Sequence, residues 1–218
     1  MFSPEIYIER RKVLKKSVKS GAIIFPANNI PAMNYPSNNY PFRQDSSFLY
    51  YFGIDEPGLM GLIDVDLDQD VLFGDNREID DVVWMGPADT IQNTAKKVGV
   101  EFTFPLSELE TRIINYKHAG KEIHYLPPYR CEISGQLSDL LKIDIKEINE
   151  NASLTLIKSV ISQRVIKSQE EIEEIEKALD ISHEMYTTAM KMAKPGLTER
   201  EIFGKLSGIS LARGNGIS

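Results

Sequence analysis

The sequence is poor in the residues that build thiol and metal sites. Its 218 residues include a single cysteine, Cys131, and three histidines, His118, His124 and His183. One cysteine cannot form an internal disulfide, which favours a reducing cytoplasm, and we expect Cys131 to be a buried structural thiol. The histidines lie far apart in the sequence and outside any His-Glu-x-x-His pattern. We therefore expect each of them on the surface or in the core, and no metal ligand among them.

Long apolar runs and excess positive charge are missing as well. No run of about 20 apolar residues is present, and the first residues, MFSPEIYIERRK, lack the apolar region of a signal peptide. The 25 basic against 32 acidic residues give a net charge of −7, which argues against nucleic acid or an anionic membrane as a partner. The sequence thus predicts a cytoplasmic protein. Its one basic cluster lies on a predicted helix and is interpreted as a solvated helix face: Arg10, Arg11, Lys12, Lys15, Lys16 and Lys19.

Catalytic and metal-binding motifs are absent from the sequence. It contains no Gly-rich phosphate loop, Ser-His-Asp set or cysteine cluster. Asp66, Asp68 and Asp70 have the spacing of the first ligands of an EF-hand, but that loop requires Gly and Glu where the chain has Val71 and Arg77. We interpret the three aspartates as an acidic hairpin turn. From the residues alone, the sequence predicts no catalytic residue and no metal ligand.

What the sequence does contain is an alternation of helix and strand signals up to about residue 150. The hairpin predicted at 59–65 and 71–73 forces at least one antiparallel pair, so we expect an α/β domain with a mixed β-sheet flanked by helices. The first helix begins after Ser3, which is a good N-cap. The other predicted strands are 22–25, 82–84, 100–104, 123–126 and 143–148, and the other predicted helices are 89–98, 107–116 and 134–141.

Toward the end of the chain only helical signals remain. A helix is predicted at 154–164, and capping boxes at 168–171 and 198–201 predict the starts of two more. We place the boundary between two domains, 1–160 and 161–218, in this region. The last helices carry an apolar stripe that would be a large exposed patch if left bare, so we expect another chain or the protein's own domain to cover it: Ile172, Ile175, Leu179, Met185, Ile202 and Leu206.

The densest aromatic segment follows a long loop rich in Asn and Pro. Residues 26–46 carry no helix or strand signal, and such a loop is usually functional or disordered. It leads into NNYPFRQDSSFLYYFGIDEPG, residues 38–58, where Arg43 and Asp45 stand among six aromatic residues. In one interpretation Arg43 and Asp45 form a buried pair that pins the loop to the sheet, and Arg43→Ala then costs a few kcal/mol. In the other, the loop and Arg43 form part of a cleft or a subunit contact.

This segment closely resembles a known family motif. YPFRQDSSFLYYFGIDEP, residues 40–57, is similar to the Tyr-Pro-[Tyr/Phe]-Arg-Gln-[Asn/Asp]-Ser signature of Xaa-Pro aminopeptidases (aminopeptidase P), of the creatinase or pita-bread peptidase family. The signature belongs to the amino-terminal domain of these enzymes. Shorter similarities extend over nearly the whole chain: 9–12 and 21–25 to the family's first helix and strand, Trp84-Met85-Gly86 to its Trp-x-Gly, and 164–178 and 194–202 to the linker and first helices of its catalytic domain.

The resemblance implies a ribonuclease-H-like amino-terminal domain followed by the first helices of a truncated catalytic domain. The family releases the residue that precedes proline at the N-terminus of peptides, using water activated by two divalent metals, usually manganese. The ligands, two Asp, one His and two Glu, lie beyond the helices present here. No catalytic or metal residue can therefore be carried over, and we expect the chain alone to be inactive. In the family this domain builds homo-oligomers and lines the substrate cleft, which makes Tyr40, Arg43, Asp45 and Trp84 the cleft or interface candidates.

The sequence is also compatible with two other classes of protein. The same fold serves as a non-enzymatic protein-interaction module in histone-chaperone subunits, and the acidic balance of the chain is compatible with such a role. A creatinase-like amidinohydrolase shares the catalytic fold but matches the aromatic motif poorly. The intact Arg-Gln-Asp-Ser sequence at 43–46 favours the aminopeptidases.

Overall fold

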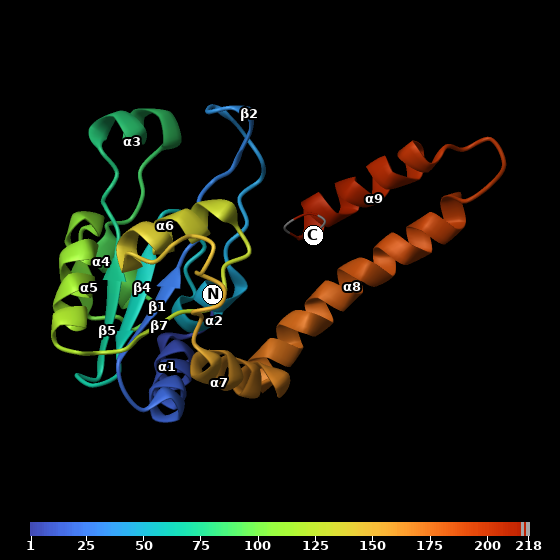
Figure 1. The fold of residues 1–218 in the computed structure, drawn as a ribbon. Helices are drawn as coiled ribbons and strands as arrows, with labels where there is room; N and C mark the ends of the chain where they lie inside the picture. Colours follow the sequence, from blue (N-terminus) through green and yellow to red (C-terminus); the bar gives the residue numbers. More distant parts are fainter. Residues whose placement is uncertain (215, 217–218) are drawn as a thin grey trace. The chain divides into compact units, whose positions relative to one another are not determined.

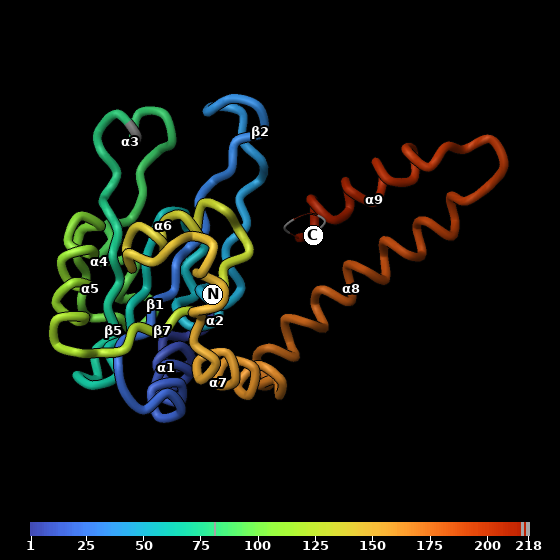
Figure 2. Tube along the Cα trace, viewed as in Figure 1, coloured from blue at the N-terminus to red at the C-terminus, as the bar shows by residue number. Residues whose placement is uncertain are grey.

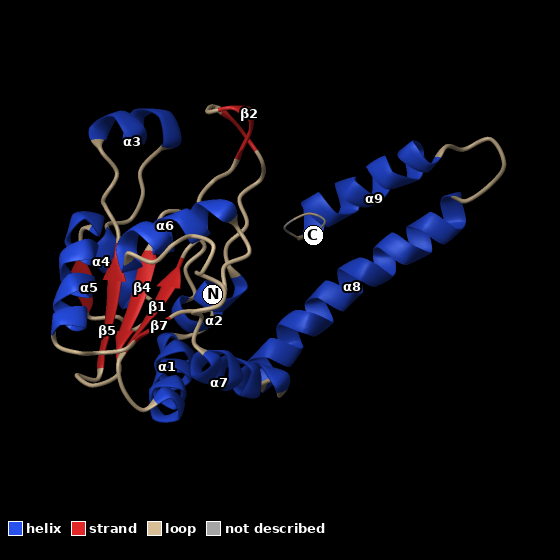
Figure 3. Cartoon of the chain, viewed as in Figure 1, coloured by secondary structure: helices blue, strands red, loops and turns tan. Residues whose placement is uncertain are grey.

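The chain comprises two compact units. The computed structural model describes residues 1–214 and 216, without the side chain of Asp81. Unit 1 is Met1–Val165 and unit 2 is Ile166–Ser218 (Figure 1, Figure 2). Unit 1 combines strands with helices, whereas the described residues of unit 2 form helices and their connections (Figure 3).

Unit 1 is built around a five-stranded sheet with the order β6-β5-β4-β1-β7. β4 pairs antiparallel with both β1 and β5, while β7 runs parallel to β1 and β6 runs parallel to β5. The sheet is therefore mixed, and the predicted α/β architecture with its central hairpin is confirmed. The strands are β1 (Ala22–Pro26), β4 (Met60–Asp64), β5 (Gln69–Phe73), β6 (Phe102–Phe104) and β7 (Ile123–His124).

Helices cover both faces of this sheet (Figure 3), because side chains along its central strands alternate between two cores. On β1, Ile23 and Phe25 belong to one core and Ile24 to the other. Helices α1, α2, α4 and α7 complete the first core, and α5 and α6 complete the second. Their bounds are α1 (Pro4–Val18), α2 (Ser46–Phe52), α4 (Ile91–Lys96), α5 (Leu109–His118), α6 (Cys131–Leu141) and α7 (Leu154–Val165), and a 3-10 turn at Leu106–Glu108 precedes α5.

Two of the predicted strands are wrong. The segment 82–84 lies in helix α3 (Ile79–Met85), where the N–H of Gly86 donates to the carbonyl of Val82. The β-branched composition favours a strand, but β5, the strand that this segment follows, is already paired on both sides and cannot accept it as a neighbour. The segment 143–148 forms turns, because the side chain and carbonyl of Asp144 accept the N–H groups of the residues that would continue a strand.

The loop at 26–46 is more ordered than predicted. Strands β2 (Ala32–Tyr35) and β3 (Asn38–Asn39) form a small antiparallel hairpin apart from the main sheet. All four residues of β2 are exposed, so this hairpin projects into solvent instead of adding to the core.

Unit 2 consists of helices α8 (Gln169–Met192) and α9 (Glu199–Arg213), which pack against each other. The capping box at the start of α8 is confirmed: Ser168 Oγ accepts the N–H of Glu171 at 3.4 Å, and Glu171 Oε2 accepts the N–H of Ser168 at 2.9 Å. At the start of α9, Glu201 Oε2 accepts the N–H of Thr198 at 2.8 Å. What covers the apolar stripe of these helices stays a prediction.

Candidate functional site at the aromatic helix

The Arg-Gln-Asp-Ser motif forms the entrance to helix α2. Asp45 is the N-cap, and its Oδ1 accepts hydrogen bonds from the N–H groups of Ser47 and Phe48, both at 2.8 Å. These are two of the N–H groups that the first turn of a helix leaves without a backbone partner. Gly53 ends the helix with a φ of 64°, and a side chain there would collide with the ring of Tyr7. Helix α2 is therefore fixed at both ends.

Arg43 does not form the predicted pin. Its side chain is exposed, and among the described residues no ion pair joins it to Asp45, whose carboxylate caps α2. The buried residue of the motif is Gln44, which is 3% exposed. Its Oε1 accepts the N–H groups of Asn28 and Asp45, and its Nε2 donates to the carbonyl of Glu56 at 2.6 Å. A neutral amide thus ties the loop to the fold without burying a charge.

Half of the six aromatic residues in this segment belong to the core. Phe48, Tyr51 and Phe52 are completely buried. The rings of Phe48 and Phe52 stack with 5.2 Å between centroids, and the ring of Tyr51 lies 4.9 Å from that of Phe25 on β1. Tyr40 differs, because it precedes the helix and is 53% exposed. Of the aromatic side chains in this motif, Tyr40 is the one proposed for the site, and it lies on the surface.

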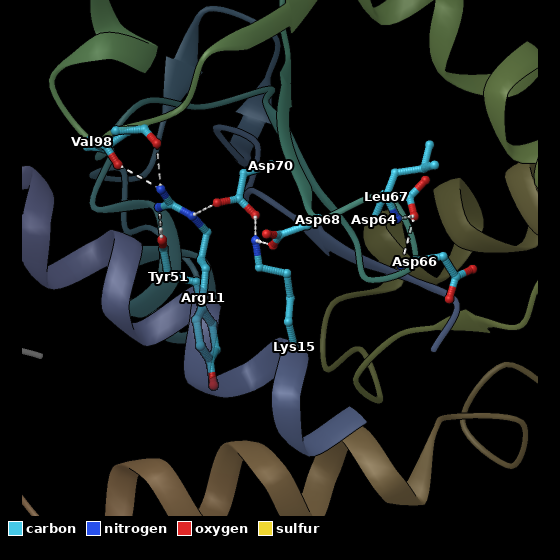
Figure 4. Close-up of polar contacts among 10 residues, drawn as sticks. Arg11, Lys15, Tyr51, Asp64, Asp66, Leu67, Asp68, Asp70 and Val98 are labelled. Atoms are coloured by element: carbon cyan, nitrogen blue, oxygen red, sulfur yellow. Dashed lines mark hydrogen bonds and ion pairs between the residues drawn. The ribbon is translucent and has the colours of Figure 1, made fainter. Parts of the chain in front are cut away.

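Arg11 of helix α1 is a charged residue that lies buried beside α2 (Figure 4). Its Nε donates to Asp70 Oδ2 and its Nη1 to the carbonyl of Tyr51, both at 2.7 Å. Its Nη2 donates to the carbonyls of Val98 and Gly99, at 3.0 and 2.9 Å. Burial lowers the pKa of Arg11, and the nearby carboxylate of Asp70 offsets only part of this effect. The guanidinium stays charged. One side chain therefore joins α1, α2, β5 and the turn that precedes β6.

The solvated helix face predicted for the basic cluster is wrong for its first two members. Arg10 is buried like Arg11, and its guanidinium lies 3.9 Å from the centroid of the Tyr50 ring. Its Nη1 also donates to the carbonyl of Tyr50 at 2.9 Å. The spacing carries the missed signal, because Arg11 shares one helical face with three apolar residues that are buried: Tyr7, Leu14 and Val18.

The acidic hairpin turn between β4 and β5 is confirmed, and lysines neutralise it (Figure 4). Lys15 Nζ lies 2.7 Å from a carboxylate oxygen of Asp68 and 3.1 Å from one of Asp70, and Lys121 Nζ lies 3.2 Å from one of Asp64. The hydrogen bond from Lys15 lowers the pKa of Asp68. Ammonium groups thus stand where a bound cation would be expected. Within the described residues, no group of three or more His, Cys, Asp or Glu side chains could hold a metal ion.

Trp84 and the motif loop lie at the same end of the sheet. β1 and β5 are both antiparallel to β4, so their carboxyl ends lie at the same end of the sheet. The loop with Tyr40 and Arg43 follows β1, and helix α3 with Trp84 follows β5. Both project beyond that end of the sheet (Figure 1). The side chain of Trp84 is 87% exposed. The fold therefore brings three of the four candidates to one end of the unit as surface residues, and uses Asp45 as a helix cap.

The cysteine and one of the histidines differ in burial. Cys131 is exposed at the start of α6, so the buried thiol predicted for it is wrong. His124 is buried, and its ring nitrogens lie 2.8 Å from Ser153 Oγ and 3.1 Å from the carbonyl oxygen of Ser20. Neither residue lies near the motif loop in sequence.

Among the described residues, no helix has both the length and the apolar character needed to cross a membrane.

The chain matches the family described as "Aminopeptidase P, N-terminal domain" over residues 7–124. This range includes the whole motif and Trp84. Among curated proteins, the chain is 31% identical to a probable Xaa-Pro aminopeptidase of Aspergillus terreus, over 79% of this chain and 36% of that protein. It is 26% identical to the Xaa-Pro aminopeptidase of Escherichia coli, over 94% of this chain and 48% of that protein. The chain therefore spans less than half of the length of each of these two relatives.

The fold is also similar to solved structures. Escherichia coli aminopeptidase P with a Glu383Ala substitution, in complex with substrate, matches 98% of this chain and 50% of its own chain, with a TM-score of 0.79 and 23% identity. A zinc-substituted form of the same enzyme in complex with product matches equally, with a TM-score of 0.79. At this identity the likeness shows the fold alone.

Proposed function

Because this chain belongs to the family of aminopeptidase P N-terminal domains, we propose that it forms the non-catalytic amino-terminal part of an Xaa-Pro aminopeptidase. In this proposal residues 1–160 are the amino-terminal domain, and residues 161–218 are the linker and first helices of the catalytic domain. The observation that carries it is the family match over residues 7–124, which contains the complete aromatic motif.

The chemistry belongs to the longer protein in this proposal. Its substrates are peptides with proline in the second position, and two divalent metals, manganese in the first instance, activate the attacking water. In this proposal the metal ligands come from residues outside this chain. The part of the protein seen here then contributes the surface against which the substrate cleft is assembled.

We place this surface at the carboxyl end of β1 and β5. Tyr40, Arg43 and Trp84 are exposed there, which is the state expected of side chains that meet a substrate or a neighbouring subunit. Asp45 contributes indirectly, because its cap on α2 holds the backbone from which Arg43 projects. We propose that this end forms a homo-oligomer contact and shapes the cleft.

The first test is an assay of the chain against a longer protein from the same gene. With manganese and a Xaa-Pro peptide, the longer protein should release the first residue and the present chain should not. Turnover that follows the 218-residue chain through purification contradicts the non-catalytic role. A longer reading frame without two Asp, one His and two Glu would instead favour the non-enzymatic interaction module.

The second test concerns the surface. The mass of the longer protein in solution, measured by light scattering, should fall toward that of the monomer in Trp84→Ala. Leu67→Ala is a matched control, because Leu67 is also exposed but lies on the β4–β5 turn at the opposite end of the sheet. Equal masses for both variants and the unchanged protein would remove Trp84 from the proposed contact.

A further inference from the structure

Asn28 is a buried polar residue at the end of the sheet where the proposed surface lies. It follows β1 by two positions and is 2% exposed. Its N–H donates to Gln44 Oε1 at 2.7 Å, and its carbonyl accepts the N–H of Gly58 at 3.2 Å. The backbone of Asn28 is therefore fixed by partners that do not involve its side chain.

The side-chain amide of Asn28 joins two segments that are distant in the chain. Its Nδ2 donates to the carbonyl of Arg43 at 2.9 Å and to the hydroxyl oxygen of Tyr129 at 3.0 Å. Arg43 is 15 residues away in the sequence, and Tyr129 is 101 residues away. An amide nitrogen carries two hydrogens, so both are used here. One buried group thus sets the position of the Arg43 backbone relative to Tyr129.

These bonds hold the backbone of Arg43 while its side chain stays in solvent. Asn28 holds its carbonyl, and the next residue, Gln44, is buried and hydrogen-bonded through both atoms of its amide. An exposed guanidinium is therefore carried on a fixed backbone. Such a side chain loses less freedom when it binds, which is the arrangement expected of a preorganised contact.

Tyr129 lies at the same end of the sheet as the motif. It follows β7, which runs parallel to β1, so the segments after these two strands leave the sheet at one end. Tyr129 is 70% exposed, although its hydroxyl is bonded to Asn28. Asn28, Asp45 and Tyr129 also line one small hollow with a volume of about 40 Å³. Tyr129 thus shares the exposure and the location of Tyr40 and Trp84.

We propose that Asn28 is a positioning residue that holds Arg43 and Tyr129 in one arrangement, and that Tyr129 joins Arg43 in contacting the substrate peptide. The inference rests on the proposed function, because it takes the surface at the carboxyl end of β1 to line the substrate cleft. It goes beyond that function in two respects. It adds Tyr129 to the surface, and it assigns to Asn28 an effect on peptide binding that is exerted through Arg43.

Steady-state kinetics of the longer protein, with manganese and a Xaa-Pro peptide, test the positioning role. Asn28→Ala removes both side-chain hydrogen bonds and should raise KM about fivefold to tenfold, while kcat changes less than about twofold. Asn29→Ala is the matched control, because Asn29 is the adjacent residue of the same type and is exposed. It should leave both constants unchanged. Equal KM values for Asn28→Ala and the unchanged protein overturn the inference.

A double-mutant cycle separates positioning from stability. Arg43→Ala should raise KM at least as much as Asn28→Ala does. Adding Asn28→Ala to it should raise KM less than about twofold further, because only the bond to Tyr129 remains to be lost. A purely structural Asn28 would instead lower the folded fraction, and with it kcat, equally in both backgrounds. Urea denaturation identifies conditions in which every variant is folded, and full additivity of the two KM effects contradicts the proposal.

Two substitutions of Tyr129 test its part in the surface. Tyr129→Phe removes the hydroxyl that Asn28 binds and should raise KM about twofold. Tyr129→Ala also removes the exposed ring and should raise KM about fivefold or more. Because Tyr129 is exposed, both variants should fold. Equal KM values for the two variants remove Tyr129 from the surface that contacts the peptide.

The same assay distinguishes this inference from the proposed function. If the unchanged longer protein gives no turnover, the proposed function is contradicted and the inference falls with it. If the unchanged protein turns over the peptide and Asn28→Ala has the same KM, the proposed function stands and only the inference is overturned.

Discussion

Helices α2 and α3 are both seven residues long and rich in large apolar side chains, yet their surroundings are opposite. In α2, Phe48 and Tyr51 are completely buried, whereas in α3 the side chains of Val83 and Trp84 are largely exposed. The comparison teaches that apolar content predicts burial only where a sheet face is available to receive it. Helix α3 therefore keeps its apolar side chains on the surface of unit 1, where α2 buries its own.

The structure explains why α2 is the buried helix. It is capped by Asp45, it ends at Gly53, and the carbonyl of Tyr51 in its last turn accepts a hydrogen bond from Arg11. Its rings also pack against Phe25 of β1. Helix α3 instead follows β5 and lies beyond the end of the sheet (Figure 1).

The largest expected effect is on the buried side of this comparison. Arg11→Met should lower the free energy of unfolding by about 3–5 kcal/mol, because Asp70 keeps Lys15 but loses its hydrogen bond from Arg11, and the carbonyls of Tyr51 and Val98 lose a buried donor. Urea denaturation measures the change. Lys12→Met is the matched control on the exposed side of the same helix and should cost less than about 0.5 kcal/mol. Similar losses for the two variants would mean that Arg11 is not the link between the helices.

A smaller effect is expected at the start of α2. Asp45→Ala should destabilise the protein by about 1 kcal/mol, because the N–H groups of Ser47 and Phe48 lose their acceptor. Asp45→Asn keeps an oxygen at the same place and should restore most of the loss. Thermal denaturation of the three proteins distinguishes a cap from a charge partner, since a lost charge pair would make the Asn variant as unstable as the Ala variant.

Alkaline pH should weaken the packing around α2. Burial, and then the neighbouring Tyr50, raises the pKa of Tyr51, so the folded state favours its neutral phenol. An unfolded tyrosine ionises near pH ~10, so the stability that Tyr51 contributes is complete below that pH and is lost as the pH rises toward its raised pKa. The free energy of unfolding should be measured between about pH 8 and 11, a range that includes the reference tyrosine pKa of about 10. It should decrease less steeply with pH in Tyr51→Phe than in the unchanged protein. Tyr186→Phe, at an exposed position of unit 2, should leave the slope unchanged.

The smallest effects are expected on the exposed side. Arg43→Ala and Trp84→Ala should each change the free energy of unfolding by less than about 0.5 kcal/mol, because both side chains project into solvent. This replaces the loss of a few kcal/mol that a buried Arg43 implies. A chemical denaturation curve for each variant gives the value. A loss above about 2 kcal/mol in Arg43→Ala would instead support the interpretation that Arg43 and Asp45 form a buried pair.

Local chemistry explains which features the sequence by itself determined. The central hairpin, the mixed sheet, the helix after Ser3 and the capping box at Ser168 follow from turn residues, alternation and capping groups within a few positions of one another. The family motif is equally local, because its residues are consecutive. All of these can be predicted without knowing which elements meet.

Only the tertiary structure decided which charged and apolar side chains are buried. Arg11 is buried and Arg43 is exposed because Asp70 and the carbonyls of Tyr51, Val98 and Gly99 converge on the former from segments far apart in the chain. The segment 82–84 cannot pair with β5, the strand that it follows, because β4 and β6 already occupy both of its sides, and it forms helix α3. The common reason is that burial and strand pairing depend on long-range neighbours, whose positions no local pattern encodes.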